Sequence, residues 1–357
     1  MATMPQLNIS FKSAGTTALT RGERGVILLV LRQATIPTGN PITVQYDTDI
    51  PATATAANKK YINMALLGNE TAPRKVICFF IGNDAALDAT GGVFEWAQLN
   101  HADYFVMPTV ETDELTSDVK DWIIAQKASH NMIKAVLPNT AANSEWIINY
   151  TTEGVKVGTD TFTAEQFAPR IAGIICGTAL SHSVTYVAVP EATDCTRLTS
   201  AQMDAAVSAG QLFCFFDGEK VKLSRGVNSL TTTTTDKGAA FQKIKHVEVM
   251  NLIETDLRRL CQDYYIGKYP NSYDSRCLLL SAIESYLEGY VMDGMLSMAD
   301  VAFDLKAIKS AMTAVGIDAG DMSDDEILQN DFGTGAYYAI SLRLLDAIED
   351  ITINLTV

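Results

Sequence analysis

Histidines and glycine-rich turns are the first features of this sequence that could support catalysis. His182, in the stretch ALSHSVTY, could act as a general base, although a loop histidine bonded to its own backbone is the commoner arrangement. The glycines of GNDAALDATGG (residues 82–92) do not have the spacing of a dinucleotide-binding turn. The sequence also contains no phosphate-binding lysine loop, no GxSxG elbow, and no HExxH or paired CxxC motif. We therefore predict no catalytic, cofactor-binding or metal-binding residues, and we expect that the chain is not an enzyme.

Acidic residues concentrate near the end of the chain, where residues 301–357 contain ten acidic and three basic side chains. The stretch DAGDMSDDE differs from a calcium-binding loop in its ligand spacing and in the position of its glycine. Ser323 with Glu326 instead predicts a capping box, which explains the cluster without a metal. A solvated acidic loop is the commoner interpretation, and an electrostatic contact with a basic partner is the alternative. The candidate contact residues are Asp321, Asp324, Asp325 and Glu326.

Composition excludes several classes of partner. The net charge of −15 disfavours a nucleic-acid backbone or an anionic membrane as the main partner. No apolar run approaches the roughly 20 residues that cross a bilayer, and the first residues lack the features of a signal peptide. The six cysteines form no CxxC pair and lie mostly in apolar runs, so they are predicted to be reduced core residues. We expect a protein that folds in the cytoplasm, without membrane insertion.

Strand and helix patterns alternate over residues 24–218. Continuous apolar runs predict strands buried on both faces, in RGVILLVLR, KVICFFIG, DYFVMPTV and IKAVLPN. Helical patterns lie between them, and a further helix is expected over residues 164–176. WIINYTTEGVKVG predicts a hairpin around Glu153 and Gly154, and VTYVAVP and LFCFFDG predict one strand each. This order predicts an α/β domain with a mainly parallel sheet covered on both sides.

The pattern changes over residues 219–345. Five threonines, residues 231–235, indicate a connector, and a long helix follows and ends at Gly267. Ser272 is a plausible N-cap for a second helix. The stretch AYYAISLRLL alternates like a strand, with Tyr338, Ile340, Leu342 and Leu344 on one face. We predict a smaller α+β domain, formed by this part of the chain together with the N-terminal segment.

Both ends of the chain have the alternation of a short strand, and the C-terminal one has no residue left over to turn back. The segments are LNISFKS and ITINLTV, within an arm and linker at residues 1–23 and an arm strand at residues 346–357. Each could pair with its own sheet, or it could add a strand to the sheet edge of another molecule. The segments KSAGTTALTRG and DAIED beside them are predicted hinges. The apolar arm residues are Leu7, Ile9, Phe11, Ile351, Ile353, Leu355 and Val357.

Several stretches, in order along most of the chain, resemble the tail sheath proteins of contractile phage tails and phage-tail-like bacteriocins, in the branch found in Gram-positive prophages. The resemblance is densest in FAPRIAGIICGT, SVTYVAVPEATD, DAAVSAGQLFCFFDGEKVKLSRGVNSLTT, KIKHVEVMNLIETDL and YYIGKYPNS. The closing AYYAISLRLLDAIEDITINLTV fits as well. GVNSLTT and YIGKYPNS at this separation are the most specific part of the match.

This resemblance implies a structural subunit that polymerises helically, as stacked rings around an inner tail tube. It implies contraction without nucleotide hydrolysis, which drives the tube through a target cell envelope. Residues 24–218 would then point outward, and residues 219–345 would face the tube. The terminal arms would join a neighbour's sheet, with residues 338–344 as the recipient strand. The implied partners are other copies of the chain, the inner tube protein, and the baseplate and tail terminator proteins.

The resemblance also implies assembly in the cytoplasm of a bacterial host and a final place in a virion tail or a bacteriocin particle. Larger relatives carry an extra domain near the start, whereas here a short stretch, QATIPTGNPITVQYDTDIP, separates the first strand from the first helix. The alternative function is a cytoplasmic α/β enzyme that binds a nucleotide or sugar. Its site would lie near residues 82–84 or 108–111, past the carboxyl ends of the predicted strands.

Overall fold

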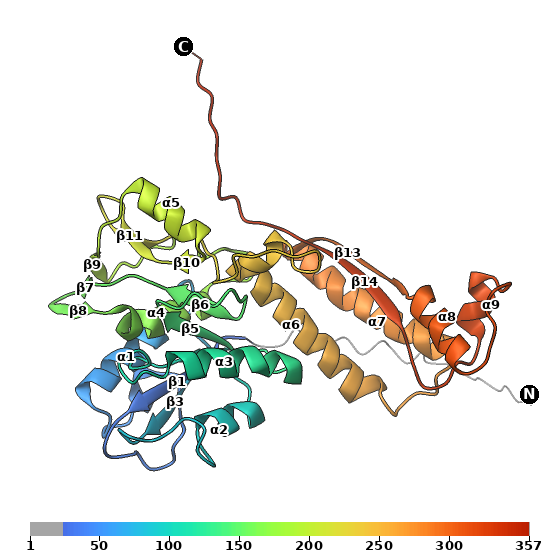
Figure 1. Ribbon diagram of the computed structural model, residues 1–357, viewed down its shortest axis with the longest axis horizontal. Helices are drawn as coiled ribbons and strands as arrows, with labels where there is room; N and C mark the ends of the chain where they lie inside the picture. Colours follow the sequence, from blue (N-terminus) through green and yellow to red (C-terminus); the bar gives the residue numbers. More distant parts are fainter. Residues whose placement is uncertain (1–23, 357) are drawn as a thin grey trace, which may run out of the picture. The chain divides into compact units, whose positions relative to one another are not determined.

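A seven-stranded sheet organises the larger part of the computed structural model, which describes residues 24–356. Its order is β10-β6-β5-β4-β1-β3-β2 (Figure 1). All neighbouring strands are parallel except β2, which runs antiparallel to β3. The mainly parallel sheet is thus confirmed. Its strands are β1 (Val26–Arg32), β2 (Ile42–Val44), β3 (Lys75–Ile81), β4 (Tyr104–Val106), β5 (Lys134–Pro138), β6 (Ile147–Tyr150) and β10 (Gln211–Leu212).

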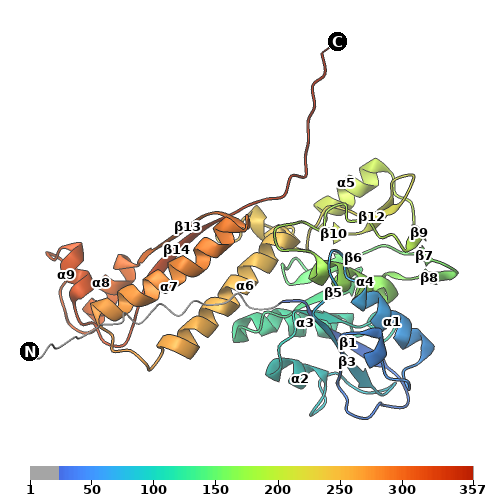
Figure 2. The same ribbon diagram turned by 180° about the vertical axis from the view of Figure 1, so that it is seen from behind.

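Helices cover both faces of this sheet, as Figures 1 and 2 show. α1 (Ala56–Leu66) and α4 (Ala164–Gly177) share a core with alternate β1 residues such as Leu29. α2 (Val93–Leu99) and α3 (Thr116–Gln126) pack on the other face, with Leu28. Both faces of β1 are therefore buried, which is why its sequence is a continuous apolar run. Gly173 lets α4 approach α1, because a Cβ there would lie 2.4 Å from the carbonyl oxygen of Ala65.

Two small antiparallel sheets flank α5 (Ser200–Ser208) in sequence. One contains β7 (Val155–Val157), β8 (Asp160–Phe162) and β9 (Ala192–Asp194), and the other contains β11 (Cys214–Phe216) and β12 (Val221–Leu223). The predicted hairpin around Glu153 and Gly154 is wrong, because β6 pairs in parallel with β5 and β7 pairs with β8. β6 is buried along its whole length, so its pairing is decided by the large sheet.

One further strand prediction is wrong, and another is only partly correct. VTYVAVP forms no strand, and it contributes one isolated bridge, from Ala188 to Lys222. LFCFFDG divides into β10 and β11 at Phe213. The break occurs because side-chain hydroxyls replace strand partners: Phe213 N donates to Ser224 Oγ, and Cys214 N donates to Thr152 Oγ1. Tertiary hydrogen bonds thus override the local strand pattern.

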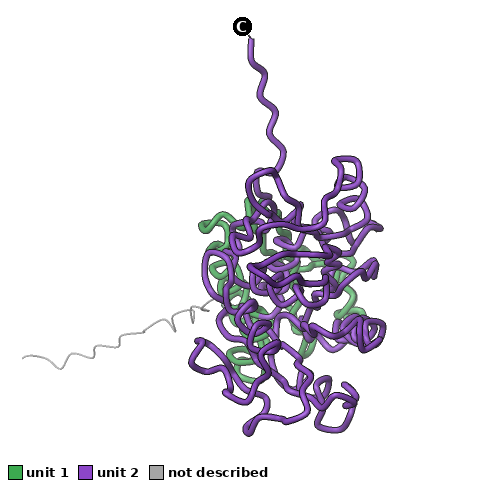
Figure 3. The backbone as a smooth tube through the Cα atoms, turned by 90° about the vertical axis from the view of Figure 1, so that its left-hand side faces the viewer, with its two compact units in different colours: residues 1–21, 256–345 green, residues 22–255, 346–357 purple. Residues whose placement is uncertain are grey.

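The described residues divide into two compact units, coloured in Figure 3. The α/β unit comprises residues 24–255 and 346–356, and the second unit comprises residues 256–345. The boundary lies inside α6 (Ile244–Leu260), later than the predicted boundary at residue 218. Residues 219–255 belong with the sheet for two reasons: Ser229 N donates to Ile147 O, and Glu248 pairs with Lys134 at 3.0 Å. The C-terminal residues 346–356 also group with the α/β unit, which the sequence did not indicate.

The second unit contains long helices and a two-stranded sheet. α6 passes into a π-helical turn, Cys261–Tyr265, and the chain then turns at Gly267, whose φ is +74°. Ser272 caps α7 by accepting a hydrogen bond from Ser275 N, as predicted. α7 packs against β13. The elements of the second unit after this turn are α7 (Tyr273–Met292), β13 (Leu296–Phe303), α8 (Leu305–Ala314), α9 (Asp324–Gln329) and β14 (Tyr338–Leu344).

Short 3₁₀ helices occur at Asp47–Asp49, Lys127–Ser129 and Ala239–Gln242. Over residues 24–356, no helix combines the length and the apolar character that a membrane span requires.

Candidate assembly surfaces

The two-stranded sheet β13–β14 is the predicted recipient of a neighbour's arm. Its strands pair antiparallel, with Val301 opposite Ile340 and Phe303 opposite Tyr338. Within the described residues each strand has one partner only, so each leaves an edge of backbone groups without a strand beside it. A two-stranded sheet is marginally stable by itself and gains from further strands or from packing on a helix.

The two faces of this sheet differ. Phe303 and Tyr338 stack with their ring centroids 5.6 Å apart on a half-buried face, to which Ile340, Leu342 and Leu344 also belong. Met298, Ala302 and Arg343 alternate with these residues and are exposed. The structure therefore brings the four predicted recipient residues together on one half-buried face of β14. Their role as recipients remains a prediction.

The C-terminal segment, residues 351–356, has no helix or strand, and Figure 1 draws it as an extended trace. Ile351, Ile353 and Leu355 are 73%, 74% and 86% exposed, although their alternation is that of a half-buried strand. Pairing of this segment with its own sheet is absent over residues 24–356. The other predicted arm residues, Leu7, Ile9, Phe11 and Val357, lie outside the described residues.

Residues 346–350, predicted as a hinge, are bound to the α/β unit by side chains. Asp346 accepts a hydrogen bond from Lys243 Nζ at 2.7 Å and lies 3.1 Å from His246 Nε2. Burial alone would raise the pKa of Asp346, but the contacts with Lys243 and His246 outweigh it and lower that pKa. Further along the same segment, Glu349 and Asp350 both contact Arg225. Sequence reasoning missed this attachment, since no local pattern links positions more than one hundred residues apart.

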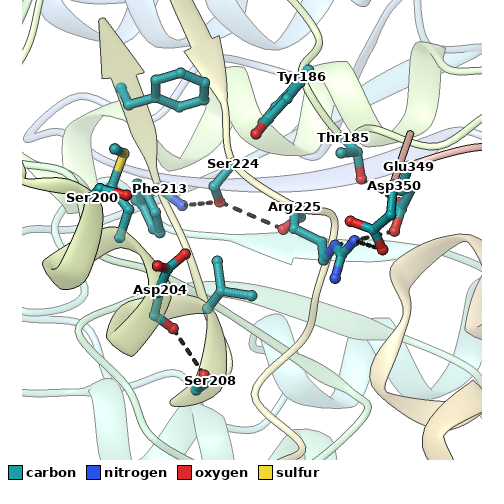
Figure 4. Close-up of a pocket in the computed structure, with 13 residues that line it drawn as sticks. Thr185, Tyr186, Ser200, Asp204, Ser208, Phe213, Ser224, Arg225, Glu349 and Asp350 are labelled. Atoms are coloured by element: carbon teal, nitrogen blue, oxygen red, sulfur yellow. Dashed lines mark hydrogen bonds and ion pairs between the residues drawn. The ribbon is translucent and has the colours of Figure 1, made fainter. Parts of the chain in front are cut away.

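A cavity of about 400 Å³ lies beside this attachment, inside the α/β unit (Figure 4). Asp204 from α5, Phe213, Tyr186 and Arg225 line it, together with Glu349 of the C-terminal segment. Figure 4 shows the carboxylates of Glu349 and Asp350 turned toward the guanidinium of Arg225.

The acidic candidates cluster around the start of α9. Ser323 and Glu326 form the predicted capping box, in which Glu326 N donates to Ser323 Oγ. The backbone N–H and the hydroxyl of Ser323 donate to the Glu326 carboxylate and lower its pKa. Asp321, Asp324 and Asp325 are exposed nearby. Negative charge near a helix N-terminus is locally favourable, so the helix itself explains part of the cluster. Contact of these residues with a partner remains a prediction.

The two regions considered for an enzyme site are occupied by internal contacts. Arg32 at the end of β1 donates to Gly82 O at 2.6 Å and pairs with Asp113 at 2.6 Å. The backbone N–H groups of Glu111 and Thr112 donate to the carboxylate of Glu165, at 2.9 and 3.0 Å. The chain's own side chains thus occupy the carboxyl ends of these strands, where ligands of open α/β sheets usually bind.

His182 lies 2.5 Å from Glu70 on the surface, and it is 62% exposed. The described residues contain no group of three potential metal ligands.

Comparison with known proteins identifies the family. The phage tail sheath protein central domain matches residues 81–229, and the phage tail sheath C-terminal domain matches residues 236–357. The tail sheath protein of Clostridium phage phiCD119 is 34% identical over 99% of both chains. The helical sheath of the anti-feeding prophage in its contracted state superposes with a TM-score of 0.72 at 13% identity, over 100% of this chain and 99% of that one.

A second solved structure, the sheath tail protein of Desulfitobacterium hafniense, gives a TM-score of 0.68 at 19% identity, over 84% of this chain and 94% of that one. These two likenesses show a shared fold. The full-length similarity to the phage protein carries the assignment further. The chain belongs to the phage tail sheath protein family, and it is a structural tail sheath subunit rather than an enzyme.

Proposed function

We propose that copies of this chain assemble helically around an inner tail tube by exchanging terminal strands with their neighbours. The observation that carries the proposal is the pairing of two features in one chain. Residues 351–356 have the alternation of a strand but pair with no strand among residues 24–356, and β13–β14 has two open edges over the same residues. A strand without a sheet and a sheet without flanking strands are complementary.

The energy of such an exchange is adequate for assembly. A seven-residue strand can form roughly 4 to 7 backbone hydrogen bonds, each contributing about 1 kcal/mol net. Burial of three exposed side chains, Ile351, Ile353 and Leu355, would add about 1.5 to 3 kcal/mol each if it were complete. Donor and recipient are different surfaces, so the contact is heterologous and can propagate into a helical polymer.

The assembled sheath is a metastable state in this proposal. The second unit, with its exposed acidic residues Asp321, Asp324 and Asp325, faces the tube, and the α/β unit points outward. Contraction releases the free energy of better-matched contacts between subunits and requires no nucleotide hydrolysis. The further partners are the baseplate and tail terminator proteins, and assembly takes place in the cytoplasm of the bacterial host.

The proposal is tested with two substitutions one residue apart in the terminal strand. Ile353→Asp places a charge on the apolar face, whereas Asn354→Asp places the same charge on the opposite, polar face. We expect Ile353→Asp to abolish tubes in negative-stain microscopy and to leave soluble, folded subunits. Asn354→Asp should polymerise like the unmodified chain.

A truncated chain without residues 351–357 should behave like Ile353→Asp. Circular dichroism of each variant establishes that the subunit still folds. Tubes of unchanged abundance from the truncated chain would overturn the strand-exchange proposal.

A further inference from the structure

We propose that residues 346–350 are a latch, which sets the point from which the terminal strand leaves the α/β unit, and that Glu349 is the residue that closes it. The latch itself is a property of the single subunit. Its significance for assembly rests on the proposed strand exchange. The carboxylate of Glu349 is received by three side chains of the α/β unit, whereas most of the surrounding segment is exposed.

The receptor for Glu349 consists of two hydroxyls and one guanidinium. Thr185 Oγ1 and Ser183 Oγ donate to Glu349 Oε1, at 2.5 and 3.1 Å. Arg225 Nε lies 3.2 Å from Glu349 Oε2. The Glu349 side chain is only 10% exposed, so these contacts satisfy a largely desolvated charge. Hydrogen bonds to a charged group are stronger than those between neutral groups.

The backbone around the receptor holds these hydroxyls in place. Gly226 N donates to Thr185 Oγ1 at 2.9 Å, and this orients the hydroxyl proton of Thr185 toward Glu349. Gly226 also makes room for the loop, because a Cβ there would lie 2.8 Å from Val184 Cγ2 and 3.2 Å from Ser183 Oγ. The receptor therefore depends on a glycine that never touches the carboxylate.

Tyr186, which follows Thr185, has an unusual backbone conformation. Its φ is +59°, in a region that bulky residues rarely occupy. Two contacts compensate for this strain: Tyr186 N donates to Leu223 O at 3.1 Å, and its ring packs edge-on against Phe215, with 5.4 Å between ring centroids. Strained backbone that persists through such contacts is characteristic of functional sites.

Among residues 24–356, few other contacts hold the latch. Ile348 is 87% exposed, so apolar burial contributes little. Arg225 Nη2 lies 2.5 Å from Asp350, which is closer than its Nε lies to Glu349, but the Asp350 side chain is 86% exposed. Water screens an exposed pair strongly, whereas a buried carboxylate depends on its partners. Asp346 supplies a second attachment through Lys243. A segment held mainly by polar contacts can be released without disturbing the core.

The adjacent carboxylates provide a matched test on full-length, unassembled subunits. Glu349→Gln removes the negative charge that Arg225, Thr185 and Ser183 contact and replaces one of its two acceptor oxygens with an NH2 donor. Asp350→Asn makes the same charge change on the exposed neighbour. Subtilisin digestion followed by mass spectrometry measures the cleavage rate within residues 346–350. Because Glu349→Gln loses hydrogen bonds to a buried charge, we expect its cleavage rate within residues 346–350 to rise by about 10-fold or more. For Asp350→Asn, whose side chain is exposed, we expect this rate to rise by less than about 3-fold. Cleavage within residues 351–356 should be equally fast in every variant.

Gly226→Ala is a second variant that crowds the receptor and leaves the carboxylate intact, and it should accelerate cleavage within residues 346–350 in the same way. Unchanged cleavage in Glu349→Gln, or equal acceleration in Glu349→Gln and Asp350→Asn, would overturn the latch. Polymerisation of the chain truncated before residue 351 would overturn strand exchange without altering the cleavage result. The two proposals can thus fail separately.

Discussion

The α/β unit and the second unit bury their apolar side chains to very different degrees. Six of the seven residues of β1 are buried, and cores on both faces of the large sheet include the helices that cover it. β13 alternates between exposed and half-buried residues from Met298 onward, and Met292 and Val315 of the second unit are 84% and 56% exposed. Both faces of the large sheet are thus covered within one chain, whereas β13–β14 keeps one exposed face, as expected of a region that gains contacts on assembly.

Charge is also distributed differently in the two units. In the α/β unit, Glu248 is 6% exposed and lies 3.0 Å from Lys134 Nζ and 3.2 Å from Arg24 Nε, while Tyr104 Oη donates to it at 2.7 Å. The acidic residues around α9 in the second unit are exposed. Buried charges of this kind depend on their own partners, and exposed charges remain available to other molecules.

The largest expected effect comes from the same substitution made in each unit. Leu29 is fully buried, so Leu29→Ala should lower the free energy of unfolding by about 2 to 5 kcal/mol. Leu342 is half-buried, so Leu342→Ala should cost about 1 kcal/mol in the isolated subunit. All three tryptophans, Trp96, Trp122 and Trp146, lie in the α/β unit, so fluorescence in urea follows that unit, and far-UV circular dichroism follows both.

Equal losses from the two substitutions in isolated subunits would contradict this difference between the units. If β14 is a recipient strand, the cost of Leu342→Ala should grow in the assembled polymer, because the neighbour's strand would then cover this side chain. Dissociation of assembled tubes by urea measures that cost.

A smaller loss of stability is expected when the pH is lowered, and it should originate in the α/β unit. Burial alone would raise the pKa of Asp103, but the hydrogen bond and charge of His101, the charge of Lys134 and the amide of Val26 outweigh burial and lower the pKa from 3.8 to about 2. A carboxylate with a lowered pKa contributes stability above its unfolded pKa. This contribution is lost as the pH falls through the folded pKa.

Asp103 should therefore contribute about 2 kcal/mol that disappears between roughly pH 4 and pH 2. Asp103→Asn should flatten the fall in stability over this range, as measured by urea unfolding at a series of pH values. Asp160→Asn is the control, because both side chains of the Asp160–Lys60 pair are exposed and such a pair contributes little to stability. If the free energy of unfolding of Asp103→Asn fell with decreasing pH as steeply as that of the unmodified chain, other carboxylates would be responsible for the fall.

The smallest perturbation is thiol labelling, which leaves the sequence unchanged. Cys78, Cys176, Cys195 and Cys214 are buried in the α/β unit, and burial raises the pKa of Cys78 and Cys214 to about 12. The remaining two cysteines, at positions 261 and 277, are half-buried in the second unit. Because the thiolate is the reactive form, a thiol reagent should modify these two first in the native subunit. Mass spectrometry identifies the modified residues. Early modification of the four buried cysteines would contradict this difference in burial between the two units.

Local patterns predicted the elements whose neighbours in sequence are also their neighbours in space. The apolar runs of β1, β3 and β5, the helix α4 and the caps Ser272 and Ser323 all follow from residue type and short-range spacing. β13 was not predicted, because LSMADVAF lacks the regular alternation of its partner β14. The hairpin around Gly154 failed because β6 pairs with β5 instead of with the next strand. Pairing partners of parallel strands are set by the whole sheet, and one strand's sequence does not contain them.

The sequence by itself determined that this chain has an α/β region, a smaller region with a strand near its end, and a terminal segment with a strand pattern. It also carried the resemblance to tail sheath proteins that the comparisons confirm. Only the tertiary structure decided that the units divide inside α6 and that residues 346–350 return to the α/β unit. The reason is physical: periodicity reports the two sides of one element, whereas the contacts of Glu349 with Ser183 and Arg225 join residues far apart in the chain, and these arise only when the whole unit folds.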